Sequence, residues 1–318
     1  MMALPKRLRK APNIMLSLST SWNHSASLDM RQWLESVRSI GFNTIELGYT
    51  LTHQQVDQIV ASLDPLGMHV SSIHNFSPIP YDEPSPRHPS NHYRLSSLDP
   101  REQKKAIEWT KYTIDLAVHV KAKVVVIHAG TLELDKDPSK RMLELYKAKK
   151  SHAPEFAADK ALLLKLRENN KKPYLEVLKA SLSEVVDYAA AKKVVIGLET
   201  RYYPIEIPNF DEIGYFLELF HKKGMSYWHD VGHAEIQERL GLAVHDEYFK
   251  KYQKYLIGVH IHGIREIRDH LIPFDGDMDL ERFLPYFSAD IIKVVESRTG
   301  TLDQLKNSRQ KLLDLLPK

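Results

Sequence analysis

The 318-residue sequence contains no cysteine. This absence excludes structural disulfides, thiolate nucleophiles, iron–sulfur clusters and zinc sites built on cysteine. Any metal ion that the protein binds must therefore be held by histidine and carboxylate side chains.

An excess of charge of one sign is also missing, because 44 basic residues stand against 41 acidic ones and the formal net charge is +3. So small a balance indicates neither a nucleic-acid partner nor a membrane surface. No apolar run approaches the roughly 20 residues needed to span a bilayer. Residues 1–12 are basic, but Ser17 interrupts the apolar stretch after them, so we interpret them as a flexible tail and not as a secretory signal. We expect a cytoplasmic protein, and assembly into a homo-oligomer stays open.

The sequence also lacks a glycine-rich phosphate loop, a Gly-x-Ser-x-Gly motif and a His-Glu-x-x-His motif, which disfavours nucleotide-dependent enzymes and serine hydrolases. Its 43% hydrophobic and 27% charged residues are the composition of a folded globular chain. The length fits two average domains or one large barrel.

Eight short apolar runs typical of β-strands recur along the chain, and most are followed by a pattern typical of amphipathic helices. Strands that alternate with helices form parallel sheets, and eight such units favour a closed barrel. We therefore predict a single (β/α)8 TIM barrel over residues 13–318. The predicted strands are Ile14–Leu18, Asn43–Leu47, Val70–His74, Val124–His128, Val194–Glu199, Met225–Asp230, Ile257–His260 and Ile291–Glu296.

Several helix starts are also legible in the sequence. Thr52 with Gln55, and Thr301 with Gln304, have the spacing of a capping box. Pro173 suits the first position of a further helix, because proline is tolerated there.

Two connections are longer than the others, since 54 residues separate His74 from His128 and 71 separate His128 from Glu199. The first connection predicts a stiff, proline-rich loop over residues 75–100. The second predicts a helical insertion over residues 131–172, with charged helices near 140–150 and 154–167. Both leave the barrel at the carboxyl ends of strands, where barrel enzymes carry their active sites. The sequence leaves two roles open for each long connection: a lid over the active site, or a surface decoration or subunit contact.

Histidines and acidic residues close six of the predicted strands. Because the carboxyl ends of parallel barrel strands meet at one mouth, we expect these side chains to converge. Oxygen and imidazole donors together suit a divalent cation such as Mn²⁺, Zn²⁺, Co²⁺ or Mg²⁺. The six residues are His74, His128, Glu199, Asp230, His260 and Glu296.

Four features of the chain point in one direction: the order of these residues, the Asp-x-x-His of Asp230 to His233, the strand Val259–His262 and the segment His270–Asp279. Together they resemble the xylose isomerase-like TIM-barrel superfamily. This superfamily includes sugar and sugar-phosphate isomerases and epimerases, and zinc-dependent AP endonucleases. The resemblance extends over nearly the whole chain. It is specific for the fold and the metal site and weak for the substrate.

The resemblance implies four metal ligands, of which the two glutamates also form the acid/base pair in the ketose epimerase branch. The four are Glu199, Asp230, His260 and Glu296. It implies that His233 contacts the substrate, or a further zinc in the nucleases. His74 and His128 match positions that line the pocket in members with one metal and bind an additional zinc in the nucleases.

Four other residues are candidates for substrate binding. Arg201 and Arg298 each follow a proposed glutamate ligand by two positions, where they either steer its carboxylate or bind an anionic substrate; solvated surface arginine is the alternative. His262 shares a strand face with His260 and supports the ligands. Trp22 either stacks on a sugar ring or packs in the core.

The chain departs from the nuclease pattern in two places. Arg268-Asp269-His270 stands where the nucleases have Asp-x-His, which puts a cation at the position of a zinc ligand. Phe274-Asp275-Gly276 lacks the first of two glycines. Both departures disfavour a complete trinuclear site.

Taken with the resemblance, these residues predict a divalent-metal-dependent isomerase or epimerase of a small sugar, sugar phosphate or related polyol carbonyl compound. Proton transfer would pass through a metal-bound enediolate, with Glu199 and Glu296 as acid and base. The alternative is that one glutamate only binds the metal and that a water or His233 carries the proton. The alternatives are a zinc-dependent AP endonuclease-like phosphodiesterase, a dehydratase that uses the same metal site, and a sugar-binding barrel without catalysis.

Overall fold

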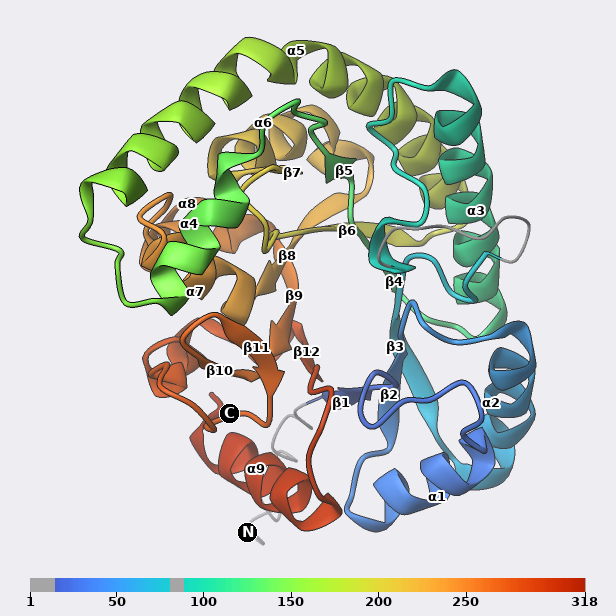
Figure 1. Cartoon of the computed structure of the whole chain (residues 1–318). Coiled ribbons are helices and arrows are strands. Elements are labelled where there is room, and N and C mark those ends of the chain that lie inside the picture. Colours follow the sequence, from blue (N-terminus) through green and yellow to red (C-terminus); the bar gives the residue numbers. More distant parts are fainter. Residues whose placement is uncertain (1–14, 81–88, 318) are drawn as a thin grey trace, which may run out of the picture.

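The eight predicted strands form one closed barrel in the computed structural model, which describes residues 15–80 and 89–317 (Figure 1). The predicted tail, residues 1–12, and residues 81–88 of the proline-rich loop lie outside the described residues. Neighbouring strands are all parallel and follow the order β1, β12, β9, β8, β6, β4, β3, β2 around the barrel. The prediction of a TIM barrel is confirmed. The barrel strands are β1 (Leu16–Ser19), β2 (Thr44–Leu47), β3 (His69–His74), β4 (Val124–Ile127), β6 (Val195–Glu199), β8 (Met225–Asp230), β9 (Leu256–Ile261) and β12 (Ile292–Val295).

Helices surround this ring of strands (Figure 1). They are α1 (Met30–Ser39), α2 (His53–Leu66), α3 (Pro100–His119), α4 (Pro138–Lys147), α5 (Pro154–Ala191), α6 (Phe210–Phe220), α7 (Val231–Arg239), α8 (His245–Tyr252) and α9 (Leu302–Leu315). Short 3₁₀ helices are η1 (Pro89–Asn91), η2 (His221–Lys223), η3 (Gln253–Tyr255), η4 (Leu280–Arg282) and η5 (Leu284–Tyr286). The chain from β9 to β12 has no α-helix and instead forms the hairpin β10 (Gly263–Arg265) and β11 (Arg268–Leu271), followed by η4 and η5.

Both predicted capping boxes are present. The Thr52 side chain accepts a hydrogen bond from the backbone N–H of Gln55, whose side chain accepts one from the Thr52 N–H. Thr301 and Gln304 do the same at the start of α9. In each case two donors that a helix start leaves unpaired are satisfied.

The predicted helix start at Pro173 is wrong, because α5 is one continuous helix and Pro173 lies inside it. A proline inside a helix costs about 3 kcal/mol through a lost hydrogen bond and a clash with the preceding turn. Both halves of α5 bury apolar side chains, however, with Leu163 before the proline and Leu178 and Leu182 after it. Each buried leucine contributes about 1.5–3 kcal/mol, which outweighs the cost of the proline.

Trp228 fills the barrel beneath the carboxyl-terminal mouth. It is fully buried in a cluster with Val124, Val126, Ile292 and Val294, and its ring lies 5.1 Å from that of His260. Glycine on the neighbouring strand β9 makes room for it, because a Cβ at Gly258 would lie 2.2 Å from the Trp228 ring. The residues at the mouth therefore stand on a rigid apolar floor.

The insertion between β4 and β6 packs against the loops around the mouth. Met142 of α4 and Leu163 of α5 share an apolar cluster with Ile236 of α7 and with Ile264 and Ile267 of the β10–β11 hairpin. The short strands β5 (Gly130–Thr131) and β7 (Glu206–Ile207) pair antiparallel beside it. Among the helices of the described residues, none has the length and apolar character to cross a membrane.

Candidate metal centre

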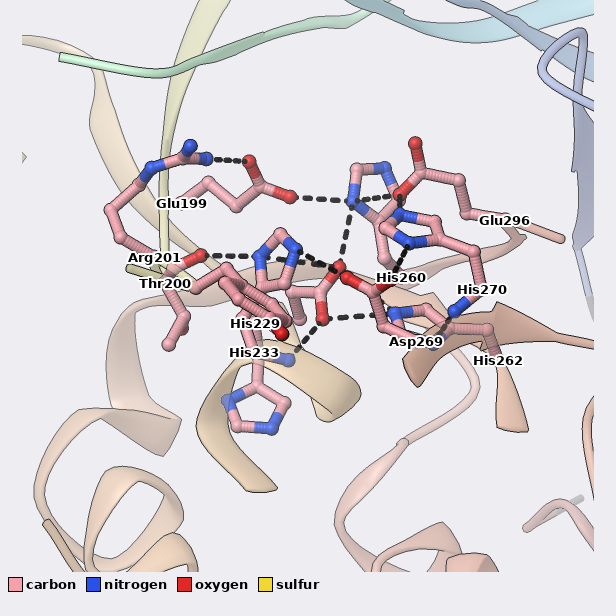
Figure 2. Close-up of polar contacts among 12 residues, drawn as sticks. Glu199, Thr200, Arg201, His229, His233, His260, His262, Asp269, His270 and Glu296 are labelled. Carbon is pink, nitrogen blue, oxygen red and sulfur yellow. Dashed lines mark hydrogen bonds and ion pairs between the residues drawn. The ribbon is translucent and has the colours of Figure 1, made fainter. Parts of the chain in front are cut away.

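Four buried side chains meet at the carboxyl-terminal mouth of the barrel (Figure 2). Glu199 ends β6, Asp230 ends β8, His260 lies on β9 and Glu296 follows β12. One ligand atom from each lies within 4.8 Å of the others. The structure thus brings together all four residues that the resemblance implies as metal ligands.

His260 lies at the middle of this group. Its Nδ1 is 2.7 Å from Glu199 Oε1 and 3.1 Å from Glu296 Oε2. Its Nε2 faces Glu46, at 3.0 Å from Oε1. This arrangement, in which a carboxylate orients a histidine so that its other nitrogen faces the centre, is common behind protein-bound metals.

Glu46 was not predicted from the sequence as a site residue. The residue lies on β2, is fully buried, and accepts a hydrogen bond of 2.8 Å from the Ser72 hydroxyl. A signal was present, because Glu46 is the single charged residue of an otherwise apolar stretch, Thr44–Leu47. A buried charge of this kind needs a partner.

The pKa values of the Glu199, Asp230 and Glu296 carboxyls reflect the histidines that surround them. Burial alone would raise the pKa of Glu199, but the His128, His260 and His74 rings outweigh burial and hold it well below its usual value. Burial is likewise outweighed at Asp230, whose pKa His233 and His262 lower, and at Glu296, whose pKa His260 and His270 lower. All three are therefore anions at neutral pH, which is the form that binds metals.

His74, His128 and Arg201 surround the Glu199 carboxylate on one side. Glu199 Oε2 lies 2.5 Å from His128 Nε2, 3.0 Å from Arg201 Nη1 and 3.5 Å from His74 Nε2. Burial, and then the Arg201 charge, lower the pKa of His128 to about 3. The contact between Arg201 and Glu199 fits the first of the two roles predicted for Arg201, which stays a prediction.

Asp230 begins a second group on the other side. Its Oδ1 accepts from the His233 backbone N–H at 2.7 Å and so caps α7, while His262 Nε2 donates to it at 3.0 Å. A Cβ at Gly232 would lie 2.0 Å from the His262 ring, so only glycine allows this approach. His262 therefore orients Asp230 from behind and does not line the cavity.

The structure corrects the expectation for Arg268. Its side chain is exposed, and the neighbouring Asp269 instead lies 3.0 Å from His270 Nδ1 and 3.8 Å from His233 Nε2. Burial alone would lower the pKa of His270, but Asp269 and then Glu296 raise it to about 10. No cation from Arg268 enters the centre, and an acidic residue stands beside His233 after all.

Trp22 and His229 lie away from the centre. Trp22 is buried in the core, where its backbone carbonyl accepts a hydrogen bond from Trp33 Nε1, and it does not line the cavity. His229, adjacent to Asp230, turns outward and contacts Tyr227 and His245. Strand alternation predicts this orientation for His229.

A cavity of about 200 Å³ opens above the four central residues. Arg298 lies exposed at its rim and donates a 2.8 Å hydrogen bond to the Tyr49 hydroxyl, and Ser90 and Asn91 reach it from the proline-rich loop. A cavity of this size suits a small molecule. Its lining includes Tyr49, His74, His128, Glu199, Arg201, Tyr202, His233, Asp269, His270, Glu296 and Arg298.

The donor set of the central group fits a divalent cation. Three carboxylates and one imidazole converge here, with one ligand atom of each within 4.8 Å of the others. Mn²⁺, Zn²⁺, Co²⁺ and Mg²⁺ all accept mixed oxygen and imidazole ligands. Glu199, Asp230, His260 and Glu296 would hold the ion.

Replacing Glu46 by glutamine is expected to weaken divalent-metal binding by about 10–100-fold, because the carboxylate that orients His260 loses its charge. The dissociation constant, measured by competition with a chelator, checks this. Glu35→Gln, at an exposed glutamate of α1, is the matched control and should change nothing. Unchanged metal affinity in a folded Glu46→Gln protein would contradict the role of Glu46.

Residues 34–290 match a protein family described as xylose isomerase-like TIM barrel. Similar solved structures include a 3-keto-D-glucoside 4-epimerase from E. coli, with 13% identity, a TM-score of 0.66, and coverage of 95% of this chain and 100% of the other. A putative xylose isomerase from Rhodospirillum rubrum has 13% identity, a TM-score of 0.69, and coverage of 96% and 100%. A D-psicose 3-epimerase from Clostridium cellulolyticum has 14% identity, a TM-score of 0.63, and coverage of 94% and 97%. No curated protein matches significantly. Likeness at this identity shows a shared fold.

Proposed function

Because this chain belongs to the xylose isomerase-like TIM barrel family, we propose that it is a divalent-metal-dependent isomerase or epimerase of a small sugar, sugar phosphate or related polyol carbonyl compound. One observation carries the proposal. Glu199 and Glu296 both line one small cavity, and each also contacts the buried His260. Two carboxylates that flank the same substrate can remove a proton from carbon and return it.

A divalent ion held by the four central residues would polarise the carbonyl group of the substrate and so acidify the C–H bond on the adjacent carbon. Glu199 or Glu296, as the carboxylate, then removes the proton from carbon, and the other glutamate, as the protonated carboxylic acid, returns one. Arg201 holds Glu199 at 3.0 Å, and His270 lies 3.5 Å from Glu296. These contacts hold both carboxyl groups at the cavity.

His233 is proposed to contact the substrate. Its Nδ1 donates to the backbone carbonyl of Thr200 at 2.9 Å, which leaves Nε2 on the cavity side near Asp269. His74, His128 and Arg298 complete the lining and offer donors for substrate hydroxyls. An anionic group on the substrate would be recognised by Arg298 at the rim.

A zinc-dependent phosphodiesterase of the AP endonuclease type is a second candidate, and a specific observation favours it. Two further groups of potential ligands adjoin the central one: His74, His128 and Glu199 on one side, and Asp230, His233 and His270 on the other. With Arg268 outside the centre, the objection that it places a cation there is removed.

Both candidates are tested with the same purified protein. We expect isomer or epimer formation, followed by NMR, from at least one member of a panel of aldoses, ketoses, inosose-type cyclitols and their phosphates in the presence of Mn²⁺, Co²⁺, Zn²⁺ or Mg²⁺. Loss of water from a panel member would favour the dehydratase. Cleavage of abasic duplex DNA that requires metal and is abolished by His270→Ala would put the phosphodiesterase first.

A further inference from the structure

Three side chains contact the oxygen Oε2 of Glu199: one from β3 and two from the segments that follow β4 and β6. His128 Nε2 lies 2.5 Å from it, Arg201 Nη1 3.0 Å and His74 Nε2 3.5 Å. The two histidines and Glu199 form a group whose ligand atoms lie within 4.8 Å of one another, separate from His260. By donor chemistry alone this group would suit a second divalent cation beside the central one. It differs from the central group because the Arg201 guanidinium contacts Glu199 Oε2, the oxygen that faces both histidines.

We propose that the Arg201 guanidinium takes the place of a second metal ion beside Glu199, so that the His74, His128 and Glu199 group stays metal-free while the central group binds its ion. The inference rests on the proposed function, because it assumes a divalent ion in the central group. It assigns Arg201 a role in setting how many ions the protein holds.

Arg201 is suited to this role by its charge and its burial. A guanidinium is charged at every accessible pH, so it cannot give way to a metal by losing a proton. The residue is 5% exposed, so its charge is poorly screened by water. A cation bound to Glu199 Oε2 at a normal distance of about 2.0–2.2 Å would lie within roughly 5 Å of Nη1. Repulsion at that distance, in a buried site, opposes binding of the ion.

Arg201 is also prevented from swinging away. Its Nη2 donates to Glu206 Oε1 at 2.6 Å, and the same oxygen accepts from the Asn91 amide at 3.1 Å. Glu206 is itself 3% exposed, and its Oε2 accepts from the Tyr203 backbone N–H at 2.8 Å. Moving the guanidinium would leave Glu206 buried without its cation, which is costly.

The loop that carries Arg201 and Glu206 is anchored from outside the barrel. Arg167 of α5 donates to the backbone carbonyls of Pro204 at 2.7 Å and Glu206 at 2.9 Å. It also pairs with both carboxylate oxygens of Glu212 on α6. The helical insertion thus fixes the position of the guanidinium over Glu199.

The test counts metal ions per chain in the wild type and in Arg201→Met, after equilibration with Zn²⁺ or Mn²⁺ and removal of free metal. We expect Arg201→Met to hold one more ion than the wild type, and Arg201→Met/His128→Ala to lose that ion again. With Mn²⁺, electron paramagnetic resonance should show an exchange-coupled pair that requires both His128 and the loss of Arg201. Arg298→Met, at the other cavity arginine, is the matched control and should keep the wild-type count.

In the wild-type background, His128→Ala should leave the count unchanged, because no ion is bound there. A folded Arg201→Met protein with the wild-type count, or a wild-type ion lost in His128→Ala, overturns the inference. If Arg201→Met fails to fold, Arg201→Met/Glu206→Gln removes both partners of the buried pair and is counted instead. A wild type without any bound ion refutes the proposed function, whereas an unchanged count in Arg201→Met refutes only the role of Arg201.

Discussion

Asp230→Asn is expected to reduce divalent-metal affinity by more than about 100-fold while the barrel stays folded. Asp230 is fully buried, and its Oδ2 lies 3.7 Å from His260 Nδ1 in the central group. The substitution removes a formal negative charge at the ion. Even changes behind the ligands cost about 10–100-fold in affinity, so a change at a ligand should cost more.

The fold should survive because asparagine keeps the second role of Asp230. The Asp230 side chain caps α7 by accepting from the His233 backbone N–H, and asparagine is an equally good N-cap residue. Asp29→Asn, at the N-cap of α1, is the matched control, since it makes the same change at a helix start without a metal. Metal content and a thermal unfolding curve check both variants. Undiminished metal content in folded Asp230→Asn would rule out Asp230 as a ligand.

Glu199→Gln and Glu296→Gln are each expected to lower kcat by about 10²–10⁴-fold, which is the usual contribution of one proton transfer. An amide is a poor base and cannot exchange a proton with the substrate carbon. In wild-type turnover in deuterated water, one deuterium should appear on that carbon, because a carboxylate exchanges its proton with solvent. Mass spectrometry and NMR of the product measure both the position and the amount of deuterium.

Metal occupancy has to be measured in each of these variants before activity is compared, because both glutamates are also proposed ligands. Glu281→Gln, at a glutamate outside the cavity lining, is the control and should retain full activity. Wild-type product without any deuterium would favour a direct hydride shift, or a shielded proton transfer, over the mechanism with two glutamates.

The strands and the order of the central residues were predictable from the sequence. Predicted and observed strand ends differ by no more than two residues. The reason is local, because a buried parallel strand reads as a short apolar run wherever it lies in the chain. Convergence of Glu199, Asp230, His260 and Glu296 followed from chain order, since parallel strands place their carboxyl ends at one mouth whatever the loops do.

Partners that come from distant elements were not predictable. Glu46 reaches His260 across the barrel, 214 residues away in the chain, and Glu206 reaches Arg201 in a loop that Arg167 anchors. No local sequence pattern encodes a contact between residues so far apart in the chain. They result from barrel closure and from packing of the insertion, which the sequence alone left open as lid or decoration.

The tertiary structure also decided which of two neighbouring residues faces the centre. Matching the pattern by sequence puts Arg268 at a ligand position, yet the structure exposes Arg268 and places Asp269 in the cavity lining. The β10–β11 hairpin has a register shift between Gly263 and Arg265, and His270 adopts a φ of 55°. Because side chains alternate along a strand, a shift of one residue exchanges the two faces. Hairpin register depends on how the two strands pair and pack, which no local sequence pattern fixes. Composition and strand order therefore determined the barrel and its four central residues. The folded chain determined which side chains surround those four.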